Sequence, residues 1–278
     1  MINEISDILY EHFGFFPFRR RWGSKFRPHF SFKYSGITWH VDSSRGRNGE
    51  VNLITHAHTD HHGQKNIENP FALASKETAT ILEVCCGKFV GKTFNVGKSV
   101  KVKVGDVRVK VKTYPTHHIP GASAFLLGDI LITGDIKAYT DLPKCKVLVT
   151  EATYGSPEYI FEDEIDKLVN VDEATLGAYP IGKSQRAAQI LLNAGREVCV
   201  EGRAGEICRK LGIDISNSGD VVLTTPRELK YKTGNRYVLT AQKFYRFPRI
   251  VVSDHLDYTG LIETVEHCNP EFVFFYHG

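Results

Sequence analysis

The chain has 278 residues, of which 42% are hydrophobic and 24% are charged, and its formal net charge is +3 at pH 7. This is the composition of an ordinary globular protein, long enough for one large domain or a core domain with an insertion, and its bulk charge does not indicate a nucleic-acid binder. Because it has no run of about 18 apolar residues and no basic, apolar secretory signal at its N-terminus, we expect a cytoplasmic protein without membrane contact.

The segment from residue 12 to residue 41 is both basic and aromatic. It contains no Asp or Glu, ten aromatic residues and six cations, which are Arg19, Arg20, Arg21, Lys25, Arg27 and Lys33. Basic groups interleaved with aromatic rings can neutralise phosphates and stack on bases. We favour a second interpretation, in which these are N-terminal strands whose aromatic side chains enter the core while the arginines stay in water. The two interpretations can coexist.

Short apolar runs rich in β-branched residues recur along the chain. They predict strands at residues 51–55, 100–104, 107–111, 130–133, 147–150, 198–200, 221–223, 250–253 and 272–275. A helical pattern covers Lys183–Ala194 and ends near Gly195, a residue suited to a helix C-terminus, and a second covers residues 261–267. These elements predict an α/β fold in which helices cover the sheets.

Four of the predicted strands are followed directly by a titratable residue. His56 follows the first strand, Asp135 follows the strand at 130–133, His255 comes after the strand at 250–253, and His277 ends the last one. In open α/β sheets, ligands bind at the carboxyl ends of strands. Four such residues, mostly histidine, predict one shared site.

The segment His56-Ala57-His58-Thr59-Asp60-His61 has the pattern of a metal site. His56 and His58 are two residues apart, so on an extended chain they face the same side and can bind one ion. Asp60 and His61 follow at once and would point toward a second ion. A lone His-x-His pair is weak evidence, but this longer motif directly after a buried strand is specific.

These residues resemble the histidine motif of the metallo-β-lactamase superfamily, and the resemblance continues almost to the last residue. His118-Ile119-Pro120-Gly121-Ala122 is similar to the third histidine motif, where the position before x-Pro-Gly favours His118 over its neighbour His117. Thr133-Gly134-Asp135 is similar to the bridging-aspartate motif. Asp42 stands where the family has an aspartate that supports the histidine loop. The resemblance implies an αββα sandwich.

Three further segments are similar to the extra motifs of the β-CASP group of this superfamily. They are Thr150–Gly155 with Glu151, Ser253–His255, and Tyr276–Gly278 with His277. The group includes the pre-mRNA cleavage endonuclease and the cross-link repair nucleases such as Artemis. Gly177–Arg186 resembles a segment of the cross-link repair nucleases, and is more similar still to the ligase-associated DNA exonucleases of prokaryotes.

The chain departs from the RNA-processing members in the length of its insertion. Only about a hundred residues separate Glu151 from His255, which is too few for the large cap of those enzymes. We therefore predict a core at residues 1–157, a reduced β-CASP-like insertion at 158–245, and a closing part of the core at 246–278. Endonucleolytic RNA processing becomes the less favoured activity.

The resemblance implies two divalent metal ions. One would be held by His56, His58 and His118, the other by Asp60, His61 and His277, with Asp135 bridging. Zinc suits imidazole and carboxylate ligands best, with manganese or iron as alternatives. Two ions roughly 3.5–4 Å apart can activate a nucleophile and neutralise a scissile phosphate.

The resemblance also suggests residues for proton transfer. His255 is the candidate that protonates the leaving group or stabilises the phosphate, and Glu151 would orient it and raise its pKa. Asp60 belongs to the same catalytic set. The alternative for Glu151 is a strand-end carboxylate that caps a loop.

Gly182-Lys183-Ser184 opens the predicted helix and could seat a phosphate through backbone amides, the helix N-terminus and the lysine. Arg186, one turn on, could assist, and Arg203 is a weaker candidate. The alternative is a plain helix start with a solvated lysine.

The sequence thus predicts a metal-dependent nuclease whose partner is nucleic acid, with DNA favoured and RNA possible; protein partners are left open. The favoured activity is a 5′-to-3′ DNA exonuclease of repair or processing. The first alternative is an RNA exonuclease or endonuclease, since the same catalytic residues serve both. A thioester or lactam hydrolase and a non-catalytic binding protein are the lesser alternatives.

Overall fold

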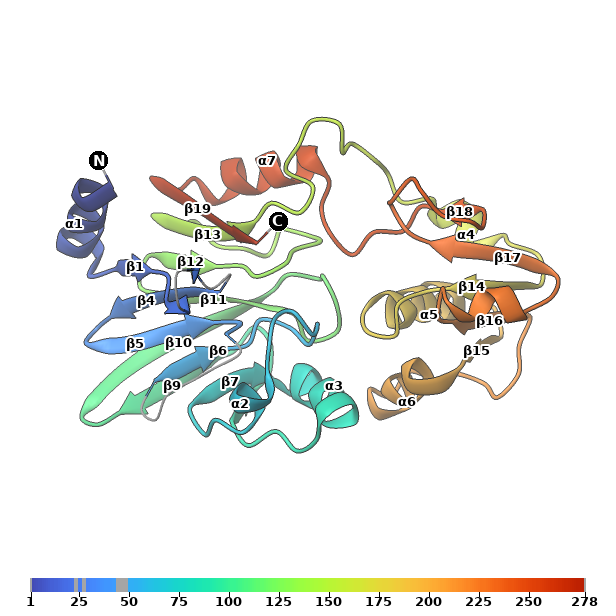
Figure 1. Ribbon diagram of the computed structural model, residues 1–278, viewed down its shortest axis with the longest axis horizontal. Coiled ribbons are helices and arrows are strands. Elements are labelled where there is room, and N and C mark those ends of the chain that lie inside the picture. Colours follow the sequence, from blue (N-terminus) through green and yellow to red (C-terminus); the bar gives the residue numbers. More distant parts are fainter. Residues whose placement is uncertain (1, 23–24, 27–28, 44–49, 278) are drawn as a thin grey trace.

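The computed structural model describes residues 2–22, 25–26, 29–43 and 50–277, apart from the side chains of residues 2–4, 21, 22, 26 and 277 (Figure 1). In this part of the chain, no helix is long and apolar enough to cross a membrane. The described residues form two six-stranded sheets, a five-stranded sheet, and the two-stranded pair β2 (Arg21–Trp22) and β3 (Lys25–Phe26).

The first six-stranded sheet comes from the N-terminal third of the chain. Its spatial order is β1 (Phe16–Phe18), β4 (Phe30–Tyr34), β5 (Ile37–Val41), β6 (Val51–Leu53), β7 (Ala72–Ser75) and β8 (Lys92–Phe94). The first three strands are antiparallel neighbours, and the last four run parallel. Helices α2 (Gln64–Ile67) and α3 (Lys76–Cys86) cover its outer face, where Ile81 and Leu82 pack in one cluster with Ala72.

The second six-stranded sheet combines the middle of the chain with its last strand. Its order is β19 (Phe272–His277), β13 (Val147–Glu151), β12 (Ile130–Ile132), β11 (Ser123–Leu127), β10 (Val107–Pro115) and β9 (Ser99–Val104). Strands β9 to β12 are antiparallel, whereas β12, β13 and β19 run parallel. Helix α7 (Tyr258–Cys268) covers the outer face, with Leu261 packed in one cluster with Leu131 and Leu148.

The main hydrophobic core lies between these two sheets. Phe32 and Trp39 from the first sheet, stacked with ring centroids 6.1 Å apart, meet Val111 and Phe125 from the second. Helix α1 (Ile2–Phe13) closes one end through Leu9. With helices outside both sheets, the layering is the αββα sandwich of an α/β protein, so the predicted fold class is confirmed (Figure 1).

The aromatic N-terminal segment contributes to this core. Phe15, Phe30 and Phe32 are buried in it, and the Arg20 guanidinium forms an ion pair with Glu50 near the surface. The favoured interpretation is therefore confirmed for the three aromatic residues, whereas Arg20 pairs with a carboxylate and does not stay in water. The side chains of Arg21 and Arg27, in the basic part of the segment, lie outside the described residues.

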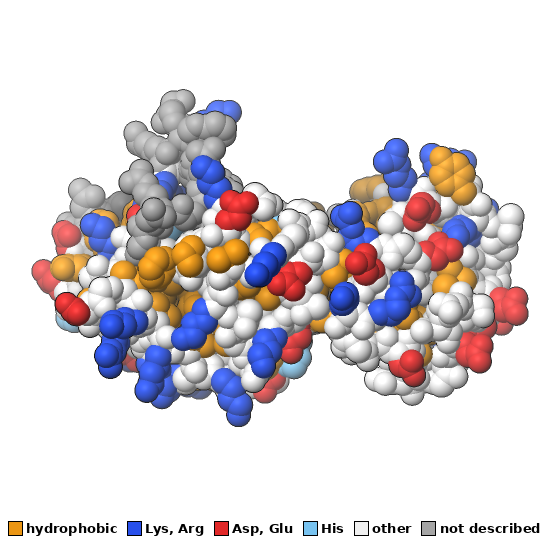
Figure 2. Space-filling model, turned by 90° about the horizontal axis from the view of Figure 1, so that it is seen from below, with side chains coloured by type: hydrophobic (Ala, Val, Ile, Leu, Met, Phe, Trp, Pro, Cys, Tyr) orange, Lys and Arg blue, Asp and Glu red, His pale blue; other side chains and the backbone are white. Residues whose placement is uncertain are grey.

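The third sheet forms a second lobe with its own core. Its strands are all parallel, in the order β15 (Val198–Val200), β16 (Val221–Thr224), β14 (Ala174–Gly177), β17 (Asn235–Leu239) and β18 (Arg249–Ile250). The lobe also contains α4 (Ile165–Val169), α5 (Lys183–Asn193), α6 (Gly202–Lys210) and the 3₁₀ turn η1 (Glu228–Tyr231). Figure 2 shows the lobes as two masses joined at a narrower waist.

The position of β18 corrects one detail of the predicted organisation. The run at 250–253 was assigned to the closing part of the core, yet Arg249 and Ile250 pair in parallel with Val238 and Leu239 of the third sheet. The inserted lobe therefore extends past residue 245. The chain returns to the first lobe only after β18, and residues 253–255 lie on this return path.

Candidate metal centre

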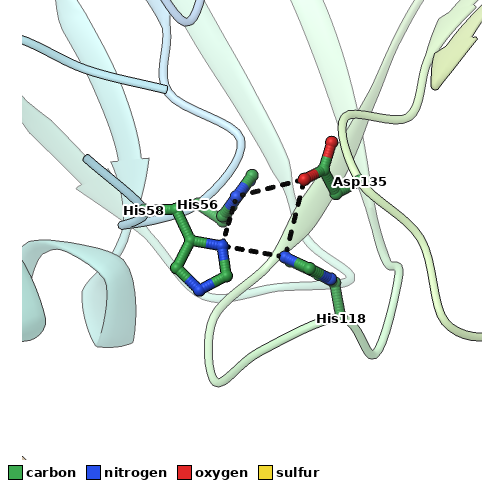
Figure 3. A group of neighbouring side chains, drawn as sticks. All are labelled: His56, His58, His118 and Asp135. Carbon is green, nitrogen blue, oxygen red and sulfur yellow. Dashed lines mark hydrogen bonds and ion pairs between the residues drawn. The ribbon is translucent and has the colours of Figure 1, made fainter. Parts of the chain in front are cut away.

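Three histidines and one aspartate converge at one edge of the sandwich (Figure 3). His56 and His58 follow β6, His118 follows β10, and Asp135 follows β12. His58 Nδ1 lies 3.1 Å from His56 Nε2 and 3.1 Å from His118 Nε2. Asp135 Oδ2 lies 3.6 Å from each of those two Nε2 atoms. The structure therefore brings together the four residues that the sequence assigned to the first metal and the bridge.

The choice between His117 and His118 follows directly from this geometry. His118 is fully buried beside the other ligand candidates, whereas the half-exposed His117 ring pairs with Asp141 at 2.7 Å. His117 has a left-handed backbone (φ 57°), so the chain reverses there and the two neighbouring rings point in different directions.

Backbone carbonyls of the inserted lobe and of the return segment fix the orientation of two of these rings. The Nε2–H of His58 is placed to donate to the carbonyl of Ile181 (3.2 Å), and the Nδ1–H of His118 to the carbonyl of Asp254 (2.7 Å). A ring nitrogen that donates a proton leaves the lone pair of the other nitrogen free. His58 Nδ1 and His118 Nε2 therefore present lone pairs to the centre.

Asp42, beneath the histidine loop, orients the ring of His56 and that of a fourth histidine, His61. His56 Nδ1 lies 2.9 Å from Thr55 Oγ1, which donates in turn to Asp42 Oδ2 at 2.7 Å. The Nδ1 of His61 lies 2.8 Å from the same Asp42 oxygen, and the Tyr276 hydroxyl donates to it at 3.1 Å. Asp42 thus acts as the sequence predicted for its position, as a support for the histidines, with the Nε2 atoms of His56 and His61 facing the centre.

The donor set fits a divalent cation. Ligand atoms of a tetrahedral zinc at 2.0–2.1 Å lie about 3.3 Å apart, and the separations of 3.1–3.6 Å found here bracket that value. Burial lowers the pKa of His56 and of His118 well below the usual range, so both rings are neutral and able to coordinate. Asp135 Oδ1 is buried without a hydrogen-bond partner among the described residues, as expected of an oxygen that binds an ion.

A second group of ligand candidates shares Asp135. His61 Nε2 lies 3.3 Å from Asp135 Oδ2 and 3.9 Å from Asp60 Oδ2. Burial opposes a charge on His61, but the Asp42 and Asp135 carboxylates outweigh it and raise the pKa of His61 well above its usual value. The clusters are consistent with a binuclear site. The side chain of His277, the third predicted ligand here, lies outside the described residues.

Asp42→Asn tests the support that Asp42 gives to the histidines. Asn tolerates the left-handed backbone of this position (φ 51°), so the fold should be retained while His61 and Thr55 lose a charged acceptor. We expect metal affinity to fall by about 10–100-fold, measured by titration of the metal-free protein with zinc. Unchanged affinity would show that the His61 orientation does not depend on the carboxylate.

His255 and Glu151 form a pair beside the histidines. The buried carboxylate of Glu151 accepts from His255 Nδ1 at 2.8 Å and from the Ile136 amide at 2.7 Å. The His255 ring also packs edge-on against His118, with centroids 4.5 Å apart. Burial disfavours charge on His255, but the Glu151 carboxylate outweighs this and raises the pKa of His255. The pair can present a protonated Nε2 to the cavity above the centre.

The residues predicted to seat a phosphate have protein partners instead. Lys183 Nζ donates to the Val252 carbonyl and forms an ion pair with Asp254 Oδ2 (3.1 Å). Arg186 forms an ion pair with Asp163 at 2.7 Å and bonds the Ser253 carbonyl. These cations thus anchor the 253–255 segment, which carries His255.

The amides at the start of α5 are also engaged. The Gly182 amide donates to Gln185 Oε1 (2.7 Å), and the amide and hydroxyl of Ser184 both bond the Tyr179 carbonyl. The predicted open helix N-terminus is therefore closed by the chain itself. Arg203, the weaker candidate, lies on the wall of the cavity above the metal centre.

Gly182→Ala tests the contact between the lobes at this point. Gly182 has φ 86°, and a Cβ would lie 2.2 Å from Ile119 Cγ2 and 3.4 Å from His58 Nε2. We expect a loss of stability of about 1–3 kcal/mol, seen in denaturant unfolding, together with weaker metal binding as the Ile181–His58 contact shifts. Gly195→Ala is the matched control, since Gly195 has a similar φ (77°) with nothing within 4 Å. Equal losses in the two variants would contradict a role for the contact.

A cavity of about 490 Å³ lies above the metal centre, between the lobes. His58, Asp60 and His255 line it from the first lobe and the return segment. Tyr179 and Arg203 line it from the inserted lobe. Tyr154, which shares the wall, was not singled out from the sequence because an isolated tyrosine after a strand carries no local signal.

The chain was compared with family models, curated proteins and solved structures. No family model matches the chain. A protein of Opitutus terrae named "Probable DNA ligase" is 24% identical over 276 residues, in a match that covers 81% of this chain and 26% of that protein. The chain thus spans about a quarter of the length of the curated relative it matches.

Three solved structures align with low scores. They are the metallo hydrolase Igni18 from Ignicoccus hospitalis (15% identity, 72% of this chain and 92% of that chain, TM-score 0.33), a diphosphatase of the PhnP family (13%, 72% and 81%, 0.32), and a metallo-β-lactamase from Pontibacter korlensis (16%, 44% and 69%, 0.29). The chain has an α/β, metallo-β-lactamase-like fold, as its two six-stranded sheets and outer helices show directly.

Proposed function

We propose that the chain is a metal-dependent phosphodiesterase that hydrolyses nucleic acid, with DNA as the favoured substrate and attack from a strand end as the favoured mode. One observation carries the proposal. His58 of the histidine–aspartate centre and His255 of the Glu151–His255 pair line the same cavity, and ligand atoms of Asp135, Glu151 and His255 lie within 4.8 Å of one another, so a phosphate in the cavity can meet both groups. A phosphodiester needs this combination, because its negative charge repels a nucleophile and its leaving alkoxide needs a proton.

Two divalent ions bound by these ligands would activate the nucleophile and neutralise the phosphate. The chain supplies the other half of the reaction. Glu151 accepts a hydrogen bond from the Nδ1–H of His255 and so holds the ring in place. In this orientation Nε2 can give its proton to the leaving oxygen. The Glu151 carboxylate favours the charged ring and so raises the pKa of His255, in the direction that a proton donor needs.

The walls of the cavity suit a nucleic acid. The cavity shares Thr153, Tyr154, Ala241 and Gln242 with a second groove of about 630 Å³. That groove is lined by aromatic and apolar side chains, among them Phe244, which is 94% exposed, together with polar groups and the charged Glu158, Lys243 and Arg249. Aromatic rings at such a groove can stack on successive bases. A small-molecule thioester or lactam hydrolase has no use for this extension.

Two further points favour DNA processing. The motifs around Glu151, His255 and Gly177–Arg186 resemble those of the ligase-associated DNA exonucleases and cross-link repair nucleases. The curated relative from Opitutus terrae is named a probable DNA ligase, and a nuclease would prepare strand ends for joining. RNA is the alternative substrate, since discrimination depends on how the groove treats a 2′-hydroxyl.

The test uses strands of one sequence, made as DNA and as RNA and labelled at either end. Purified protein is incubated with each strand and with zinc or manganese, beside a thioester substrate. We expect metal-dependent shortening of the DNA from its 5′ end, so that a 5′ label is released early as a short product. Cleavage of RNA without cleavage of DNA would contradict DNA as the substrate and favour RNA. Hydrolysis of the thioester without cleavage of any strand would overturn the proposed function.

A further inference from the structure

The outer face of the β9–β10 hairpin carries five cations beside Ser99, which stands opposite Lys112, and one exposed anion, Asp106, lies in the turn. Lys101 and Lys103 of β9 and Arg108, Lys110 and Lys112 of β10 are exposed, and the register pairs Lys101 with Lys110 and Lys103 with Arg108. The alternate residues of both strands, such as Val102 and Val109, are buried in the main core. We call these five cations the β9–β10 cation face. Lys and Arg side chains also gather on this lobe in Figure 2.

Among the described residues, none of the five cations forms an ion pair. Residues directly opposite in an antiparallel pair have Cβ atoms about 5 Å apart, where like charges destabilise the pair. Lys92 adds to the positive charge at this edge, since its Nζ donates to the Lys101 carbonyl. The face thus keeps a repulsion that a bound polyanion would relieve.

Protection of the sheet edge accounts for only part of this pattern. β9 is the last strand of its sheet, and lysines at such an edge prevent pairing with other chains. Arg108, Lys110 and Lys112 lie on β10, which is paired on both sides and needs no such protection. A face of one sign on both strands is what electrostatic binding requires.

The hairpin is connected directly to the metal centre. β10 ends at Pro115, three residues before His118, and Lys112 and Arg108 lie six and ten residues before that ligand. At about 3.4 Å per residue, the cation face begins at most about 20 Å from the centre and reaches about 35 Å from it. A nucleic-acid strand held at the centre would cover this distance with about ten nucleotides at 3.4 Å each.

We propose that the β9–β10 cation face binds the sugar–phosphate backbone of the nucleic acid behind the strand end that occupies the metal centre. The inference rests on the proposed function and names a second, sequence-independent contact with the same substrate. The regular rows of cations on a rigid hairpin suit a duplex, whose phosphates are evenly spaced. The face would hold the duplex while the end is hydrolysed.

The test is the variant Lys101→Gln, Arg108→Gln, Lys110→Gln. The control is Lys144→Gln, Lys146→Gln, Lys210→Gln, which removes the same charge from exposed lysines elsewhere. Binding to a labelled duplex of about 30 base pairs with a 5′ single-stranded tail is measured in EDTA over a series of salt concentrations. For the test variant we expect duplex affinity to fall about tenfold or more. The slope of log affinity against log salt concentration should be shallower by about 2 to 3. The control should bind as the wild type does.

Hydrolysis of a trinucleotide, which is too short to reach the hairpin, separates the two proposals. The rate of trinucleotide hydrolysis should be the same in both variants and in the wild type. The melting temperature of the test variant should not fall, since the substitutions remove a repulsion between like charges. A test variant with wild-type duplex binding and salt slope would overturn the cation face as a binding site. Polyglutamate that binds the wild type as tightly as the duplex would overturn nucleic acid as its occupant. Failure of the wild type to cleave any strand would instead overturn the proposed function.

Discussion

Asp135→Asn is expected to reduce hydrolysis by about 10³-fold or more. Asp135 Oδ2 lies within 3.6 Å of candidate ligand atoms from both halves of the centre, so it is placed to bridge two ions. Asparagine has the same shape but no charge to offset the cations. Metal ions supply several kcal/mol of transition-state stabilisation in phosphoryl transfer, and each 1.36 kcal/mol corresponds to a tenfold change in rate. Metal content, measured by elemental analysis, should fall below two ions per chain.

Asp141→Asn is the matched control for this variant. Asp141 follows β12 as Asp135 does, but it is about half exposed and pairs with His117 at the surface. The control should keep both its metal content and its activity. Full metal content with full activity in the Asp135 variant would exclude Asp135 as a shared ligand.

His255→Ala is expected to lower kcat by 10²- to 10⁴-fold on DNA, the usual contribution of a general acid, while metal content stays at the wild-type level. A phosphodiester with a nitrophenol leaving group provides a sharper readout. This leaving group departs without a proton, so the variant should lose far less activity on it. Glu151→Gln should show the same pattern with a smaller loss, because the amide still contacts His255 but no longer favours its protonated form.

His117→Ala serves as the control, since His117 is exposed and bonds Asp141 instead of the metal-centre residues. If His255→Ala lost the same activity on both phosphodiesters, His255 would position the substrate or support the fold, and it would not deliver the proton.

Much of the fold could be read from the sequence because its strands are short, apolar and rich in β-branched residues. The helix at Lys183–Asn193 was predicted to within one residue for a similar reason, as its apolar spacing is regular and Gly195 follows it. Other elements lacked such signals. Helix α6 begins Gly202-Arg203-Ala204-Gly205, where two glycines hide a helix that tertiary packing of Ala204 and Ile207 stabilises.

The candidate ligands were also readable, since the chemistry of metal binding demands a few residue types at fixed spacing. His56, His58 and His118 required only local motifs for their identification. The burial that keeps their rings neutral, and the partners that orient them, come from residues distant in sequence such as Ile181 and Asp254. No local pattern reports a backbone carbonyl that reaches a histidine more than a hundred residues away.

The sequence by itself determined the residue types of the metal centre and the class of fold, because both depend on local spacing and on periodic burial. Only the tertiary structure decided which charges remain available. Lys183 and Arg186 looked like phosphate ligands beside a helix start, yet Asp254 and Asp163 pair with them in the folded chain. Lys101 and its neighbours carried no signal in the sequence, yet the hairpin places cations opposite one another without ion-pair partners among the described residues. A charge is free or neutralised according to what lies within a few ångströms of it, and the fold alone decides that.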